Sequence, residues 1–374
     1  MQKVERSADK RSSKRGGFRL FLPALPPIIL LVLYYISCGN KAIMNWVSRN
    51  IALPYRAAAG KISSLGPLKY FSIYEVLLTL LILWALFVTV RAIIAAVKSR
   101  RISVIARRMF SILIVALYIG AIFSWLWDSG YHSTNLAEKT GLNTVATVSQ
   151  LKSAAKLFAA KANELSAQVD RDENRHFKAD KEYYFTASKE VFGNIQEEFS
   201  SLQGESFSPK PMIYSKFMSA TGFTGIYIAL TGEANINIDP PGSLLPATIA
   251  HELAHQRGVT FEEEANFSAI AACVTSGIPA FEYSGYLLGL IYLENALYKA
   301  DPEAFSEISS SLSENVRQDF KDDNDYWSKH HSQATKAAEV MYDGFLKSNG
   351  VVTGIKSYGE CVDMLSLWGA KKAN

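Results

Sequence analysis

The stretch that decides the fold is HELAHQRG, residues 251–258. His251 and His255 stand four residues apart, so on a helix both imidazoles project from one face and can reach one metal ion. Glu252 follows the first histidine directly and would lie beside that ion. Gly258 can adopt a positive φ and end the helix. The stretch therefore predicts a helix that presents two metal ligands and a carboxylate.

The spacing is the HExxH motif typical of zinc metallopeptidases. Catalytic zinc usually has three protein ligands and one open position, so a third ligand is expected nearby. Glu262, Glu263 and Glu264 follow the glycine. Glu263 stands three residues after Thr260, as in a capping box, whereas Glu262 shares a helix face with Asn266. We therefore expect Glu262 to be the third ligand, with Glu264 as the alternative.

These residues predict hydrolytic chemistry. We expect Zn²⁺ bound by His251, His255 and Glu262 to activate a water, with Glu252 as the catalytic general base. The substrate would be a peptide or protein, with the cell envelope as one source. The alternative function is a non-catalytic zinc-binding protein in envelope assembly or sensing. The intact Glu252 argues against it, because a structural zinc site does not need this carboxylate.

Two further features bear on substrate binding. Tyr283, Tyr286 and Tyr292 follow the motif, and one of them could stabilise an oxyanion. Aromatic residues at helical spacing more often belong to a core. Residues 233–238 precede the motif helix and could form an edge strand that pairs with an extended substrate. An ordinary short hairpin is the alternative for this segment.

The N-terminal third is typical of a membrane domain. Three segments, about 19–38, 73–97 and 109–127, are apolar enough and long enough to span a bilayer. Basic residues cluster before the first segment and in the loop KSRRISVIARR, which predicts that both are cytoplasmic. We therefore expect a multi-pass protein of the cell membrane, with a membrane domain at 1–128 and an extracytoplasmic domain at 129–374.

Charge supports this division. Residues 1–128 contain 18 Lys/Arg and 4 Asp/Glu, whereas residues 129–374 contain 21 Lys/Arg and 31 Asp/Glu. The acidic part would repel phosphate, so we expect membrane lipid rather than nucleic acid as a partner. No CxxC pair is present. Cys273 and Cys361 stand in apolar, helical surroundings, where free buried cysteines are common, and a disulfide between them is the alternative.

The C-terminal part predicts an α-rich, zincin-like α+β domain with a small β-hairpin. GIYIAL and ANINID are strand-like and flank Thr231 and Gly232, which suits a hairpin. Ser243 could cap the motif helix. A stripe of Leu151, Ala155 and other apolar residues predicts the first helix of the domain. The helices expected outside the motif are 143–168, 181–202, 261–275, 280–300, 303–317, 326–348 and 356–368.

Several stretches resemble a known family. TGEANINID, LLPATIAHELAHQRG, EEEANF and EYSGYLLGLIYLENAL are similar to bacterial membrane proteins grouped as domain of unknown function 3810, as are NDYWSKHHSQA and FLKSNGVVTGIKSYGECVDML. That resemblance implies a zincin-like site without indicating a substrate. More distantly, HELAH followed by ExxAN resembles gluzincin peptidases, which implies Glu262 as a ligand supported by Asn266. The six residues between His255 and Glu262 are a short gap for that pattern.

Overall fold

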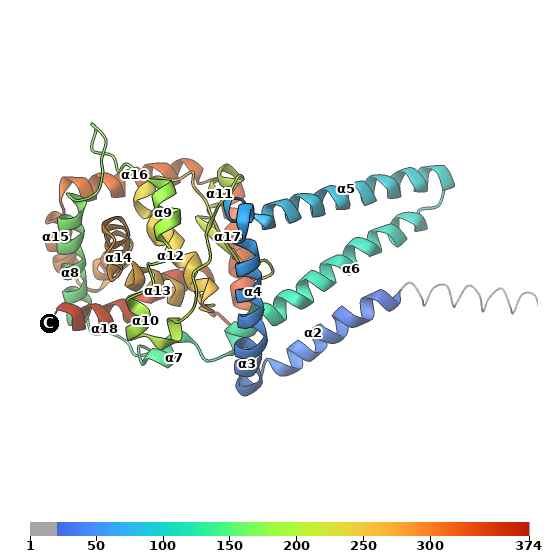
Figure 1. Cartoon of the computed structure of the whole chain (residues 1–374), viewed down its shortest axis with the longest axis horizontal. Coiled ribbons are helices and arrows are strands. Elements are labelled where there is room, and N and C mark those ends of the chain that lie inside the picture. The colour runs from blue at the N-terminus through green and yellow to red at the C-terminus, as the bar shows by residue number, and fades with distance from the viewer. Residues whose placement is uncertain (1–20, 374) are drawn as a thin grey trace, which may run out of the picture.

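The computed structural model describes residues 21–373, which form a mostly helical chain with one small sheet. Figure 1 shows three helices projecting from one side of a helical domain: α2 (Leu25–Ser37), α5 (Ile73–Ser99) and α6 (Ser103–Leu126). The longer helices of the domain are α8 (Val148–Ser166), α12 (Leu245–Gln256), α13 (Glu262–Val274), α14 (Pro279–Ala300), α16 (Glu314–His330), α17 (Gln333–Ser348) and α18 (Cys361–Ala373).

Shorter elements complete the chain. The short α-helices are α3 (Lys41–Val47), α4 (Leu53–Ser63), α7 (Leu136–Thr140), α9 (Lys181–Ala187), α10 (Ile195–Glu198), α11 (Ser215–Thr221) and α15 (Pro302–Ser310). The 3-10 segments are η1 (Leu22–Ala24), η3 (Gly66–Tyr70), η4 (Asp128–His132), η5 (Ser200–Leu202), η6 (Gly242–Leu244) and η7 (Gly354–Glu360), and η2 (Ser48–Ala52) is a π-helical turn.

Two of the projecting helices, α5 and α6, are long and apolar enough to cross a membrane. They agree with the spans predicted at 73–97 and 109–127. The span predicted at 19–38 corresponds to η1 and α2, and this apolar helix, Leu22–Ser37, is shorter than the roughly 20 residues that spanning takes. Residues 19 and 20 lie outside the described part of the chain. Three spanning helices are therefore not confirmed.

The segment between α2 and α5 packs on the helical domain. The Lys210 Nζ donates to the Ser63 carbonyl at 2.6 Å, and Lys210 is fully buried. Glu75, in the first turn of α5, accepts the backbone N–H groups of Ile213 and Tyr214 at 3.1 and 2.8 Å. These contacts fix the N-terminal end of α5 to the domain.

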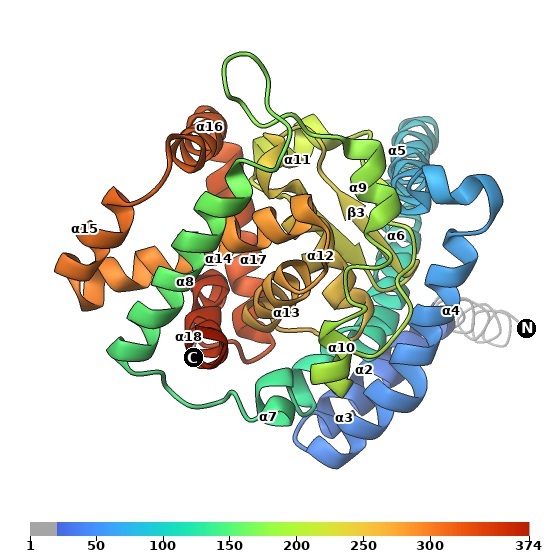
Figure 2. The same cartoon turned by 60° about the vertical axis from the view of Figure 1, so that its left-hand side comes forward.

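The core of the domain lies around α12, α13 and α14, which Figure 2 shows near its middle. The stripe predicted on α8 is confirmed, since Leu151, Ala155, Phe158 and Ala162 are all buried. Helix α8 begins later than predicted, because Thr147 and Gln150 form a capping box. Cys273 and Cys361 are free and buried in this core, so the structure has no disulfide between them.

The sheet corrects one prediction. The hairpin is confirmed, with β2 (Gly225–Ile228) antiparallel to β3 (Glu233–Ile236). However, β1 (Lys210–Pro211) pairs in parallel with the other side of β3, which gives the strand order β1-β3-β2. Residues 233–238 therefore contain the central strand and cannot offer a free edge to a substrate. The open edge beside the motif helix belongs to β2, which ends the strand order and contacts α12.

Several helix boundaries also differ from the predictions. The helix predicted at 181–202 is broken by turns between α9 and α10. The helices predicted at 303–317 and 326–348 are instead α15, α16 and α17, because Ser313 caps α16 and Ser332 forms a capping box at α17. Ser243 lies within η6 and does not cap α12.

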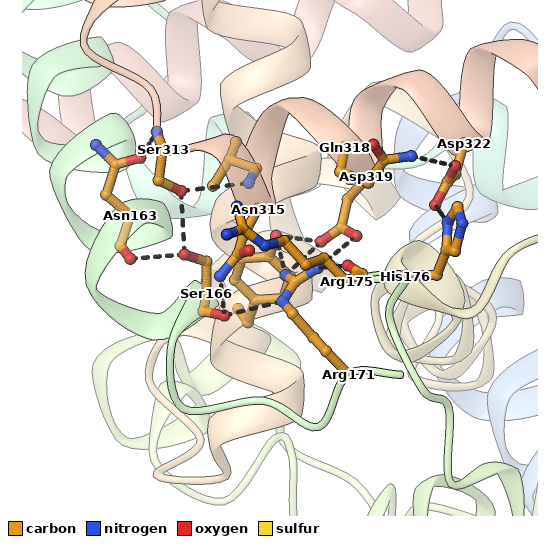
Figure 3. Close-up of polar contacts among 12 residues, drawn as sticks. Asn163, Ser166, Arg171, Arg175, His176, Ser313, Asn315, Gln318, Asp319 and Asp322 are labelled. Carbon is orange, nitrogen blue, oxygen red and sulfur yellow. Dashed lines mark hydrogen bonds and ion pairs between the residues drawn. The ribbon is translucent and has the colours of Figure 1, made fainter. Parts of the chain in front are cut away.

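A buried ion pair fastens the loop after α8 to α16 (Figure 3). Arg171 donates to both carboxylate oxygens of Asp319, at 3.0 and 2.8 Å, and Tyr283 donates to the same carboxylate. The Asp319 side chain is fully buried, and the Arg171 side chain is 10% exposed. The pair therefore holds Asp319 of α16 against the loop that follows α8.

Replacing Asp319 with alanine is expected to destabilise the fold by about 3–5 kcal/mol, because it leaves a buried guanidinium without its partner. Arg175 pairs with Glu314 nearby, but their side chains are 63% and 77% exposed. Arg175→Ala is the matched control and should cost at most about 1 kcal/mol. Chemical denaturation of the two variants in detergent measures the difference. Equal losses would mean that the buried pair does not hold the loop.

Candidate metal centre

The motif forms helix α12, and a short turn brings the next helix back to it. Pro246 lies in the first turn of α12, where its missing N–H costs no hydrogen bond. The helix ends at Gln256, and Gly258 has the predicted positive φ, at 93°. Helix α13 then starts at Glu262 and packs against α12. The chain thus reverses within the six residues that separate His255 from Glu262.

This reversal brings His251, His255 and Glu262 together. Their nearest ligand atoms all lie within 4.8 Å of one another, and all three residues are buried. Glu262 Oε2 is 3.1 Å from His251 Nε2 and 3.5 Å from His255 Nε2. The two Nε2 atoms are 3.1 Å apart. Three side chains that commonly bind metals therefore point at one spot.

The hydrogen bonds on the far side of each imidazole fix which nitrogen carries the proton. His255 Nδ1 lies 2.7 Å from the Val259 carbonyl, which can only accept. His251 Nδ1 lies 2.8 Å from Asn266 Oδ1. The amide nitrogen of Asn266 donates to the Tyr292 hydroxyl and the Tyr358 carbonyl, so its oxygen must face the histidine. When the rings are neutral, both Nε2 atoms therefore carry lone pairs toward Glu262.

The carboxylate of Glu262 is held in its ionised form. Burial opposes ionisation, but the positive charge and N–H donors of His255 and His251, when these imidazoles are protonated, outweigh it and lower the pKa of Glu262 below the usual range. Tyr342 donates a hydrogen bond to the other carboxylate oxygen, Oε1. The site is therefore a cluster of electron-pair donors that could hold a metal ion.

Glu252 lies beside this cluster and lines the same cavity as His251. Its side chain is buried, and Oε2 has no hydrogen-bond partner among the described residues. Burial raises the pKa of Glu252 to about 8. A cation bound by the neighbouring residues would favour the ionised form and lower this pKa. Glu252 thus has a free oxygen and a position suited to moving a proton.

The other two acidic residues point elsewhere. Glu264 accepts the backbone N–H of Ala137 at 2.8 Å, and burial raises its pKa to about 6. It lines a different, smaller cavity and takes no part in the cluster around His251. The predicted capping box between Thr260 and Glu263 is wrong, because Phe261 is the N-cap residue and no side chain caps α13.

A cavity of about 390 Å³ opens beside His251 and Glu252. Of the three tyrosines considered in the sequence, only Tyr292 lines it. Tyr283 belongs to the buried pair of Arg171 and Asp319, and Tyr286 packs against Phe158.

Two further tyrosines, which no local sequence pattern indicated, lie at the site. Tyr342 comes from α17 and Tyr358 from η7, and both line the cavity. The Tyr358 ring stacks near the His251 imidazole, with centroids 6.2 Å apart. Their distance from the motif along the chain hides them from a single sequence. The one available signal was the similarity of the stretch around Tyr358 to the family.

A protein-family model described as a protein of unknown function (DUF3810) matches residues 53–366. The chain belongs to this family. The part that matches DUF3810 contains α12, α13 and the three tyrosines that line the cavity, together with α5 and α6. Among curated proteins and solved structures, none matches the chain. The DUF3810 match establishes the family and indicates no activity, because the family is described as one of unknown function.

Proposed function

We propose that the chain is a membrane-anchored zinc metallopeptidase that hydrolyses peptide bonds outside the cytoplasm. The observation that carries this is the convergence of His251 Nε2, His255 Nε2 and the Glu262 carboxylate. When both imidazoles are neutral, the three groups present electron pairs with no proton between them, and a cation would turn their mutual repulsion into binding.

The spacing of the donors suits zinc. Bonds of about 2.0–2.2 Å at tetrahedral angles place ligand atoms about 3.3–3.6 Å apart. The three separations in the site are 3.1, 3.1 and 3.5 Å. His251 and His255 each have an acceptor on Nδ1, the arrangement that orients histidine ligands in metal sites. Bound zinc would polarise a substrate carbonyl and make water more acidic.

Glu252 would supply the proton transfers. Its Oε2 has no hydrogen-bond partner within residues 21–373, and Glu252 borders the cavity that a substrate would enter. As a carboxylate it would take a proton from the attacking water and return it to the leaving amine. Tyr342 and Asn266 would hold Glu262 and His251 in place during these steps.

The open edge of β2 offers a place for an extended substrate. The Thr224 carbonyl accepts the Asn237 N–H at 2.9 Å, and main-chain bonds alternate along an antiparallel pair. The N–H and C=O of Gly225 should therefore point away from β3. Gly225 borders the cavity next to Glu252, so a peptide paired with this edge would pass the site.

Gly225 also fixes how closely the strand approaches Glu252. A Cβ at Gly225 would lie 2.8 Å from Glu252 Cδ, which is too close. Gly225→Ala is expected to displace the carboxylate and lower activity by about 10-fold or more, since a misplaced catalytic group is costly. Metal content should stay unchanged, which metal analysis beside a peptide-cleavage assay would measure. Gly120→Ala is a control, because a Cβ there meets nothing within 4 Å. Full activity in Gly225→Ala would contradict the placement.

The membrane part would contain three spans, with α2 as the third. Helix α2 packs along α6, where Trp125 donates to the Leu30 carbonyl at 3.0 Å and Phe21 contacts Phe110. The loop KSRRISVIARR lies at the far end of α5 and α6 from the domain (Figure 1). If its basic residues stay in the cytoplasm, the domain is outside.

The test is the metal content of the full-length protein in detergent, beside its action on a library of quenched fluorescent peptides. We expect about one zinc per chain and cleavage that stops on chelation and returns with zinc. A protein that takes up no zinc when it is supplied would refute the metal site. One that binds zinc but cleaves no peptide would favour the non-catalytic zinc-binding alternative.

A further inference from the structure

The side of the domain from which α5 and α6 leave carries exposed apolar side chains. Figure 1 shows α3, α4, α11 and α17 along this side. We call their exposed apolar residues and the adjoining Ile213 the apolar face: Ile43, Trp46, Ile62, Ile213, Phe217, Val340 and Met341. They come from three stretches that are far apart in the sequence, and a water-facing surface rarely collects so many.

A side-chain hydrogen bond places the start of α11 beside the N-terminal end of α5. The Tyr214 hydroxyl lies 2.7 Å from Thr79 Oγ1, in the second turn of α5. Phe217 stands three residues after Tyr214, so it lies on the same face of α11. Phe217 is 69% exposed, and the adjoining Ile213 is 81% exposed. Both side chains therefore lie near the level at which the apolar stretch of α5 begins.

Helix α17 packs beside the end of α6 that adjoins the domain, as α11 does beside α5. The Phe345 ring packs against Phe123, near the outer end of α6, with centroids 6.1 Å apart. Met341 stands four residues before Phe345 and so shares its face of α17. Met341 is 74% exposed. Helix α17 thus places apolar side chains near the end of α6 that adjoins the domain.

The stretch from α3 to η3 adds positive charge. Residues 39–72 contain five Lys/Arg and no Asp/Glu. Lys41 pairs with Glu138 and Arg56 is buried, but Arg49, Lys61 and Lys69 are exposed. Exposed tryptophan and aliphatic residues interleaved with cations are typical of helices that lie in the surface of an anionic membrane.

We propose that the apolar face rests on the outer surface of the bilayer, with anionic lipid as its partner. Continuity with α5 and α6 favours lipid over a protein partner, because the face begins where the spans enter the domain. The cavity is then held close to the membrane surface, since Tyr342 of α17 and Gly222 after α11 are among its lining residues. This proposal does not depend on zinc or on hydrolysis.

Lipid quenching tests the proposal on the full-length chain. In a Cys38→Ser background, a bimane label is placed at Phe217→Cys or Met341→Cys, in nanodiscs of phosphatidylcholine and phosphatidylglycerol with brominated acyl chains. We expect quenching about twofold or more above that at Tyr298→Cys. Tyr298 is 62% exposed and packs on Phe305 of α15, at the far side of the domain (Figure 1).

The outcomes decide between occupants. Equal quenching at all three positions, or free access of aqueous iodide to positions 217 and 341, would overturn the proposal. Protection from iodide without lipid quenching would also overturn it and indicate a protein contact.

A second set of variants tests the role of charge. Changing Arg49, Lys61 and Lys69 to glutamine should lower the quenching by about twofold in the anionic discs. The control variant, Lys152→Gln with Lys156→Gln on α8, should leave the quenching unchanged. Equal quenching in phosphatidylcholine alone would refute the role of anionic lipid.

Discussion

Glu252→Gln is expected to abolish peptide hydrolysis while leaving about one metal ion bound. Removing a general base typically lowers a rate by about 10²–10⁴-fold. Glutamine has nearly the same shape as glutamate and cannot accept the proton of the attacking water. Glu252 takes no part in the cluster of His251, His255 and Glu262, so metal binding should persist. Peptide cleavage and metal analysis on the same sample measure both properties.

The pH dependence supplies a second readout. In the metal-free protein, burial raises the pKa of Glu252 to about 8, from an ordinary value of 4.5. The folded state therefore binds more protons than the unfolded state between these values, and stability falls as pH rises through this window. The metal-free Gln variant should lack this contribution. Its unfolding midpoint should therefore fall less than that of the wild type from pH 5 to pH 8.

The Glu252→Gln variant also separates the proposed functions. If Glu252→Gln binds zinc and retains the biological function of the chain, the non-catalytic zinc-binding reading is favoured. If cleavage persists at the wild-type rate, Glu252 is not the base. A variant that loses both zinc and its unfolding transition would have failed to fold, and the smaller change Glu252→Asp would then replace it.

Local sequence predicts the centre of this molecule well. The four-residue spacing of His251 and His255, the positive φ of Gly258 and the start of α13 at Glu262 depend on neighbours along the chain. The same is true of the β2–β3 hairpin, whose strands are joined by a short turn at Thr231. Such features follow from helix periodicity, glycine conformation and turn length.

Features set by distant contacts were not predictable. The strand β1 is only two residues long, and its pairing with β3 makes β3 central. Helix α16 contains the acidic run around Asp319, which local propensity disfavours, and Arg171 stabilises it from another part of the chain. Tyr342 reaches Glu262 across 80 residues of sequence. Tertiary packing decides each of these, and no local pattern records it.

The second large effect is expected from Glu262→Ala, which should lose the metal. The variant leaves two imidazoles where a zinc site needs three protein ligands. Changes to groups that only support a ligand lower metal affinity by about 10–100-fold, so loss of the ligand itself should exceed this range. Removing the carboxylate also removes the charge that offsets the cation. Titration of the metal-free protein with zinc against a competing chelator measures the affinity.

Two matched variants provide intermediate and unchanged zinc affinities for comparison. Tyr342→Phe removes one hydrogen bond to Glu262 and should weaken zinc binding by about 10–100-fold without abolishing it. Glu264→Ala removes a neighbouring carboxylate of the same chemistry, which accepts from Ala137 and does not reach the cluster, so affinity should stay unchanged. We therefore expect the zinc affinity to decrease across the series. The wild type and Glu264→Ala should bind equally tightly, Tyr342→Phe more weakly, and Glu262→Ala most weakly. Retention of zinc by Glu262→Ala together with loss in Glu264→Ala would transfer the third ligand to Glu264. Such a result would require α13 to turn by about 160–200° about its axis when the metal binds, because residues two positions apart lie on opposite sides of a helix.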